Sequence, residues 1–226
     1  MDFLGFANSD FDFFRKKGTL AKPEYDKKKE EVKTHFREFC YQLQKCYHTE
    51  TSGTLPLDKD FHGLNKNRDC IKAKSAAGRG GLFGLSIDMS QDGIAISLVC
   101  PSDPDVNRVE ELKGTIVSKG NELADFFKEN REAFVVLYRI DGKKSSDRLW
   151  NEEFKFSNRE LSSGDFTVLL QNIEKAGEGG DSLKSCPGFR IKEQFPKSDA
   201  VKQGKLLPSK ACGEVMKLFK LCDALE

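Results

Sequence analysis

Gly78–Cys100, with the sequence GRGGLFGLSIDMSQDGIAISLVC, is the stretch that decides the fold. Its two apolar arms, Leu82–Ile87 and Ile94–Val99, flank the polar residues Asp88–Gly93. Both arms are rich in the β-branched and large apolar residues that strands favour. The Asp-Gly pair at the end of the polar stretch tolerates the positive φ of a tight turn. The stretch therefore predicts a β-hairpin whose turn spans residues 88–93.

Outside this hairpin, the chain predicts a second hairpin and several helices. Residues 133–140 (AFVVLYRI) and 149–156 (LWNEEFKF) have strand composition, and Asp141-Gly142 starts a turn between them. An apolar stripe at helical spacing predicts one long helix over about Pro23–Tyr47. The remaining expected elements are a helix over 104–130 that kinks or splits at Gly114 and Gly120, a helix over 166–176, an edge strand over 189–195 and a helix that begins at Ser209.

This order of elements predicts the fold class. Adjacent strand pairs separated by helices are typical of an α+β fold. We expect a single domain over residues 1–226, with a largely antiparallel sheet built from two hairpins and flanked by amphipathic helices. Residues 1–22 form a Phe-rich N-terminal segment and residues 23–176 the core. The Gly-rich stretch 177–188 is a hinge candidate, so that residues 177–226 would form a C-terminal arm.

The composition limits the classes of function. The chain has 226 residues, of which 38% are hydrophobic and 32% charged, as in soluble globular domains. No run approaches the roughly 18 apolar residues of a membrane-spanning helix, so no contact with a membrane is expected. The formal net charge is +1, from 37 basic and 36 acidic residues. Binding to nucleic acid would therefore need a local basic patch.

The cysteines indicate the redox compartment. Their number, seven, is odd, they are scattered along the chain, and no two of them form a C-x-x-C pair. The opening sequence MDFLGFANSDFDFF lacks the basic start of a secretory signal. Both features favour reduced thiols and a cytoplasmic location. The cysteines are Cys40, Cys46, Cys70, Cys100, Cys186, Cys212 and Cys222.

A basic segment precedes the first hairpin and is the leading candidate site. Within Lys66–Arg79 five cations stand against one acid, Asp69, and glycines follow closely. Cationic side chains beside backbone N–H groups exposed by glycine are what a phosphate needs. We read the segment as a loop that binds an anion, and nucleic acid is the polyanion it favours. The candidate binding residues are Lys66, Arg68, Lys72, Lys74 and Arg79.

Established phosphate motifs are missing from this segment. Gly78–Phe83 lacks the last glycine of G-x-G-x-x-G and precedes a strand, whereas the dinucleotide fingerprint follows one. No G-x-x-x-x-G-K-[ST] occurs. Ser75–Gly81 resembles in part the N-terminal DNA-reading domain of McrB-type restriction proteins. The tryptophan that follows in that family is absent here, so no residue role is carried over.

A metal-dependent nuclease is the first alternative. Asp141 ends one predicted strand, and Glu153-Phe-Lys155 lies on the next. An acid opposite E-x-K can hold a divalent cation and a water, with the lysine stabilising negative charge. The pattern is also that of any strand face with alternating Glu and Lys.

Other catalytic or metal groupings have less support. Cys40, Cys46, His48, His62 and Cys70 lie close in sequence, but their intervals match no zinc site, so we expect no metal and no cofactor. A pair formed by Cys46 or Cys70 with His48 or His62 remains open as a nucleophile and its base.

The N-terminal phenylalanines allow two interpretations. They either fold onto the domain as part of a short helix, or they remain exposed and anchor a protein partner. The residues are Phe3, Phe6, Phe11, Phe13 and Phe14. Taken together, the sequence favours a binding or accessory domain, rather than an enzyme, that contacts an anionic partner. The nuclease and a protein-interaction module are the alternatives.

Overall fold

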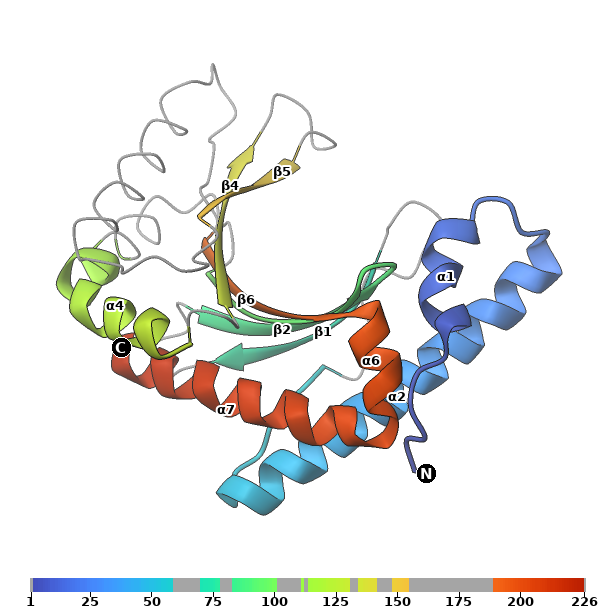
Figure 1. Ribbon diagram of the computed structural model, residues 1–226, viewed down its shortest axis with the longest axis horizontal. Helices are drawn as coiled ribbons and strands as arrows, with labels where there is room; N and C mark the ends of the chain where they lie inside the picture. The colour runs from blue at the N-terminus through green and yellow to red at the C-terminus, as the bar shows by residue number, and fades with distance from the viewer. Residues whose placement is uncertain are drawn as a thin grey trace. The chain divides into compact units, whose positions relative to one another are not determined.

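The computed structural model describes residues 2–58, 70–77, 83–100, 111, 114–130, 134–141, 148–154 and 189–225 (Figure 1). The elements are α1 (Asn8–Lys16), α2 (Lys22–Thr51), β1 (Cys70–Ala77), β2 (Phe83–Ser90), β3 (Gly93–Cys100), α4 (Gly120–Asn130), β4 (Phe134–Asp141), β5 (Arg148–Phe154), β6 (Phe189–Pro196), α6 (Lys197–Gln203), the 3-10 helix η1 (Gly204–Leu206) and α7 (Leu207–Leu225). The strand order is β1-β2-β3-β6-β4-β5. Strand β4 pairs antiparallel with both β5 and β6. The predicted α+β class with a largely antiparallel sheet is confirmed, and the sheet contains β1 and β6 in addition to the strands of the two predicted hairpins.

The chain forms two compact units, which are described separately. The first comprises Met1–Ser75, Leu85–Ile96 and Gln194–Lys217. The second comprises Ala76–Gly84, Ser97–Glu193 and Leu218–Glu226. The hinge candidate over residues 177–188 and the helix expected over 166–176 lie outside the described residues.

Alternating side chains build the core of the first unit. On β1, Ile71 and Ala73 are fully buried, whereas Lys74 between Ala73 and Ser75 is exposed. Successive side chains of a strand point to opposite faces, so one face of the strands is apolar and the other polar. Figure 1 shows α2 and the beginning of α7 on the same side of the strands. Fully buried apolar side chains from these elements include Ile71, Ile87, Ile94, Ile96, Phe36, Phe39, Leu43 and Val215.

The N-terminal phenylalanines complete this core. The rings of Phe3 and Phe6 lie 5.6 and 5.5 Å from that of Phe39 on α2. Phe13 lies 5.7 Å from Tyr25, near the start of α2. All five N-terminal phenylalanines are at most 4% exposed. The short helix folded onto the domain is therefore confirmed, and these side chains are not exposed as an anchor for a partner.

Residues 70–77 form the strand β1, whereas the sequence predicted a loop up to the first hairpin. Buried and more exposed side chains alternate along β1 as in a strand with one buried face, because Ile71, Ala73 and Ser75 are buried and Lys74 is exposed. The loop prediction was wrong because only one of these inward residues, Ile71, is a large hydrophobe. Strand formation here depends on the neighbouring strand and helices rather than on local propensity.

The first hairpin has a shorter turn than predicted. Strand β2 continues through Ser90 and β3 begins at Gly93, so only Gln91 and Asp92 form the turn. Asp88 lies within β2, where its side chain is buried and hydrogen-bonded. Asp88 and Ser90 lie on the polar face of the strand and Met89 on the apolar face, so this stretch alternates as a strand rather than forming a loop.

The strand β6 is internal rather than at an edge. It lies between β3 and β4 in the sheet. The sequence analysis expected an edge strand here, yet Arg190 is buried and donates a hydrogen bond from Nε to Ser97 Oγ at 2.7 Å. A buried cation is tolerated where a neighbouring strand supplies such an acceptor.

The remaining predictions for the described residues are close to the structure. The long helix is present as α2, and the second hairpin as β4 and β5. Residues 114–118 are helical and α4 begins at Gly120, in agreement with the break that the sequence predicted at Gly120.

The described cysteines are free thiols rather than disulfides. They are Cys40, Cys46, Cys70, Cys212 and Cys222. Among the described helices, none is both long and apolar enough to cross a membrane.

Replacing Gly93 by alanine should destabilise the protein by roughly 2–4 kcal/mol. Gly93 has φ +129°, and a Cβ there would lie 2.1 Å from the backbone oxygen of Phe195. Gly213→Ala is the matched control, since a Cβ there meets nothing within 4 Å. In α7 this second change should be neutral or stabilise by up to about 1 kcal/mol. Urea unfolding of both variants measures the difference, and equal effects would contradict the tight approach of β3 to the end of β6.

Candidate functional site

Only two of the five candidate binding residues lie among the described residues. Lys72 and Lys74 both lie on β1, which is one of the two end strands in the sheet order, β5 being the other. Lys66, Arg68 and Arg79 lie outside the described residues. Because Lys72 and Lys74 are two residues apart on a strand, their side chains leave the same face. That face is opposite to the one that buries Ile71.

Lys72 takes part in a polar network with β2. Its Nζ donates a hydrogen bond to Asp88 Oδ2 at 3.2 Å, and Ser86 Oγ donates to Asp88 Oδ1 at 2.6 Å. The Asp88 side chain is 10% exposed and that of Lys72 is 28% exposed. A carboxylate this deeply buried needs such partners. Because Asp88 neutralises part of its charge, Lys72 attracts an external anion less strongly than an unpaired lysine would.

Lys74 combines an exposed side chain with a fixed backbone. Its carbonyl oxygen accepts a hydrogen bond from the Asp58 N–H at 2.7 Å. The segment before Asp58 is held in turn, because Gln44 Nε2 on α2 donates to the Leu55 carbonyl at 2.8 Å. The bond from Asp58 occupies one carbonyl group of β1, an end strand, which lowers the tendency of β1 to pair with another strand. The two hydrogen bonds also hold Lys74 at a defined place on the surface.

The nuclease candidates are not brought together by the register of β4 and β5. Asp141 pairs with Arg148, whereas Phe154, the residue after Glu153, pairs with Val136. Glu153 is thus five positions from the partner of Asp141, which is roughly 16 Å along an extended strand. Carboxylates that share one cation must each lie within about 2.6 Å of it. Lys155 lies outside the described residues.

The described residues assemble neither the candidate metal grouping nor the pair of Cys46 with His48. Within the described ranges, no group of three or more His, Cys, Asp or Glu residues could hold a metal ion. Burial raises the pKa of the Cys40 thiol well above its ordinary value, which makes it unreactive. Cys46 and His48 are two residues apart on α2, a spacing that does not place side chains on one face. His48 Nδ1 instead lies 3.0 Å from the Gly53 carbonyl oxygen. His62 lies outside the described residues.

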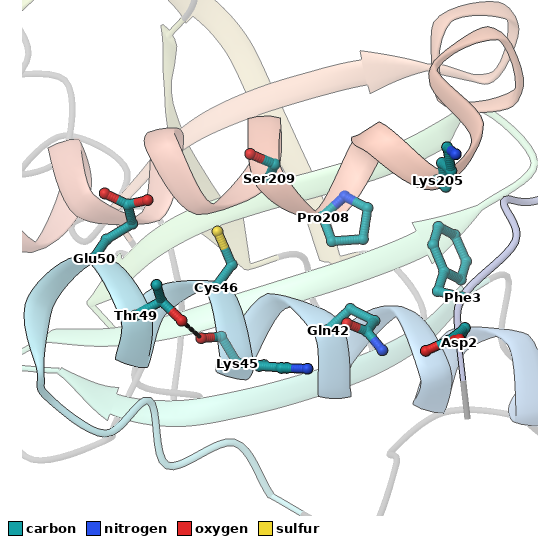
Figure 2. A pocket seen from close by; sticks show the side chains of 10 residues that line it. All are labelled: Asp2, Phe3, Gln42, Lys45, Cys46, Thr49, Glu50, Lys205, Pro208 and Ser209. Atoms are coloured by element: carbon teal, nitrogen blue, oxygen red, sulfur yellow. Dashed lines mark hydrogen bonds between the residues drawn. The ribbon is translucent and has the colours of Figure 1, made fainter.

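The first unit contains a cavity that no sequence pattern indicated. Figure 2 shows the side chains that line it, most of them from α2 and the beginning of α7. Its volume is about 400 Å³. Its charged lining is balanced, since Lys45 and Lys205 face the same space as Asp2 and Glu50. The other lining residues are Phe3, Gln42, Cys46, Thr49, Pro208 and Ser209.

Two arrangements therefore stand out among the described residues. The cation-bearing face of β1 can contact an anion, and the cavity exposes one thiol, that of Cys46. No family model matches the chain, and no curated protein matches it.

Proposed function

We propose that this domain binds a polyanion, nucleic acid above all, through the cations of β1 and the residues that flank it. The observation that supports the proposal most is the placement of Lys72 and Lys74 on one face of an outer strand. Lys66, Arg68 and Arg79, which flank β1 in the sequence, are the other cations of the proposal. Phosphate oxygens accept hydrogen bonds from such side chains, and neutralising them releases bound counterions.

A strand is a favourable support for such an interaction. The opposite face of β1 is fixed by the burial of Ile71 and Ala73. The backbone of Lys74 is fixed by Asp58. At Lys72 and Lys74 the ligand would therefore order only side chains, and not the main chain, when it binds. The entropy cost of binding is then smaller than for a flexible loop.

The ion pair with Asp88 sets the strength of the interaction. Lys72 can bind a phosphate fully only if the phosphate competes with the Asp88 carboxylate, 3.2 Å away. Lys74 has an exposed side chain and is the primary described residue of the proposed surface. With a net charge of +1, the chain as a whole provides almost no attraction at long range. Binding would then depend on charges within the Debye length, about 8 Å at physiological salt, and should be sensitive to salt.

The two alternatives receive no support from the described residues. The nuclease would need Asp141 and Glu153 near one cation, and the register separates them. The interaction module would need accessible phenylalanines at the N-terminus, and these are buried.

Replacing Lys74 and Arg79 together by alanine should weaken binding to DNA and RNA oligonucleotides. The slope of log K against log salt should fall by about one for each phosphate that the variant no longer neutralises. Lys72 is left in place, because its removal would take the ion pair with Lys72 from the buried Asp88 carboxylate. Fluorescence anisotropy at several salt concentrations gives both the affinity and the slope.

The control for this variant is Lys210→Ala with Lys220→Ala, two exposed lysines of α7. It removes the same charge from a different surface. The proposal requires the control to keep the salt slope of the wild type. If both double variants bind alike, or if the wild type binds no oligonucleotide at low salt, the basic segment is only a solvated surface.

Replacing Asp88 by asparagine should strengthen oligonucleotide binding. The change keeps the shape of the side chain but frees the charge of Lys72, so the salt slope should rise by up to about one. Asp92→Asn, in the exposed turn of the first hairpin, changes the net charge equally and serves as control. An equal gain in both variants would mean that only net charge matters, which would contradict an interaction at Lys72.

A further inference from the structure

The structure brings together two thiols that are far apart in the sequence. Cys46 lies on α2 and Cys212 on α7, and the side chain of Cys46 is close enough to that of Cys212 to raise its pKa. Cys46 is partly exposed and lines the cavity of about 400 Å³. Cys212 is 1% exposed. The two thiols are therefore neighbours that differ in their access to solvent.

The helix faces around the cavity agree with this interaction. Gln42, Cys46 and Thr49 lie on one face of α2, at the spacing of successive helical turns. Ser209 lines the same cavity from α7, and Cys212 follows it by one turn on the same face. Figure 2 shows the Cys46 sulfur pointing from α2 toward α7.

We propose that Cys46 and Cys212 form an oxidation site, at which a hydroperoxide converts the two thiols into a disulfide that joins α2 to α7. Such a site is independent of the polyanion surface on β1. It uses the cavity as the route by which a small oxidant reaches a half-buried sulfur.

The reaction has two steps. The thiolate of Cys46 attacks one peroxide oxygen, the O–O bond breaks, and Cys46 becomes a sulfenic acid while hydroxide leaves and takes up the thiol proton as water. The sulfur of Cys212 then attacks the sulfur of Cys46, the S–O bond breaks and the S–S bond forms. The departing hydroxide takes the proton of Cys212. In total the two thiols lose two electrons and two protons, and hydrogen peroxide becomes two water molecules.

The surroundings of the two sulfur atoms indicate which cysteine reacts with the peroxide first. Burial, the neighbouring side chain of Cys46 and the charge of Glu50 raise the pKa of Cys212 to about 12, so its thiol remains protonated at neutral pH. The accessible Cys46 is therefore the residue that meets the oxidant, and Cys212 is the resolving thiol. The proximity of the two sulfurs compensates for the small thiolate fraction of Cys212, because it makes the second step intramolecular.

The test uses the full chain, exposed to hydrogen peroxide in the folded state and then denatured and alkylated. Free thiols should fall from seven to five per chain, since the sequence contains seven cysteines. Peptide mapping without reductant should give one linked peptide, containing Cys46 and Cys212. The oxidised protein should also melt at a higher temperature than the reduced protein, because the cross-link restricts the unfolded chain.

Two variants test whether the link forms specifically between Cys46 and Cys212. Cys212→Ala, which keeps the buried site apolar, should form no linked peptide, and dimedone should label Cys46 as the trapped sulfenic acid. Cys70→Ser is the matched control, since Cys70 is also partly exposed but lies on β1. It should form the Cys46–Cys212 link as the wild type does. Seven intact thiols in peroxide-treated wild type, or a link between any other pair of cysteines, would overturn the proposal.

Discussion

The alternation of side chains along β1, β2 and β3 is the constraint on which the rest of the first unit depends. Leu85, Ile87, Ile94 and Ile96 leave one face of the sheet and are at most 1% exposed. Each such side chain contributes about 1.5–3 kcal/mol when it is fully buried. A shift of one residue in the pairing would turn every one of them to the other face. The same alternation fixes the outward direction of Lys72 and Lys74, so the candidate binding surface is a consequence of the core.

The polar face carries its own constraint, because part of it is buried as well. Asp88 is accommodated there only with hydrogen bonds from Lys72 and Ser86. Because Asp88 neutralises part of the charge of Lys72, the positive charge available to a ligand comes mainly from Lys74 and from the cations that flank β1 in the sequence. The oxidation site proposed for Cys46 and Cys212 depends on the opposite side of the same core, where α2 and α7 meet. The two proposals therefore use different surfaces and can fail independently.

Much of the fold could be predicted from the sequence, and the exceptions share a physical cause. The first hairpin, α2 and the β4–β5 hairpin are visible because long apolar runs or stripes mark them. Strand β1 was missed because CIKAKSAA contains one large hydrophobe, so its strand character comes from neighbours rather than from its own residues. The internal position of β6 was missed because the acceptor for Arg190 is supplied by Ser97, on another strand. The meeting of Cys46 with Cys212 has no sequence signal, since it arises only from the packing of two distant helices.

The central claim is that an anionic ligand binds the outward face of β1. Amide chemical-shift mapping with a mixed-sequence oligonucleotide at low salt tests it most directly, because it reports the location of binding as well as its occurrence. The account predicts that the shifts concentrate at Lys72, Lys74 and the adjoining Asp58, and that they fade as salt is added. Shifts concentrated on α2 and α7, or a spectrum that does not change on saturation with the oligonucleotide, would contradict it.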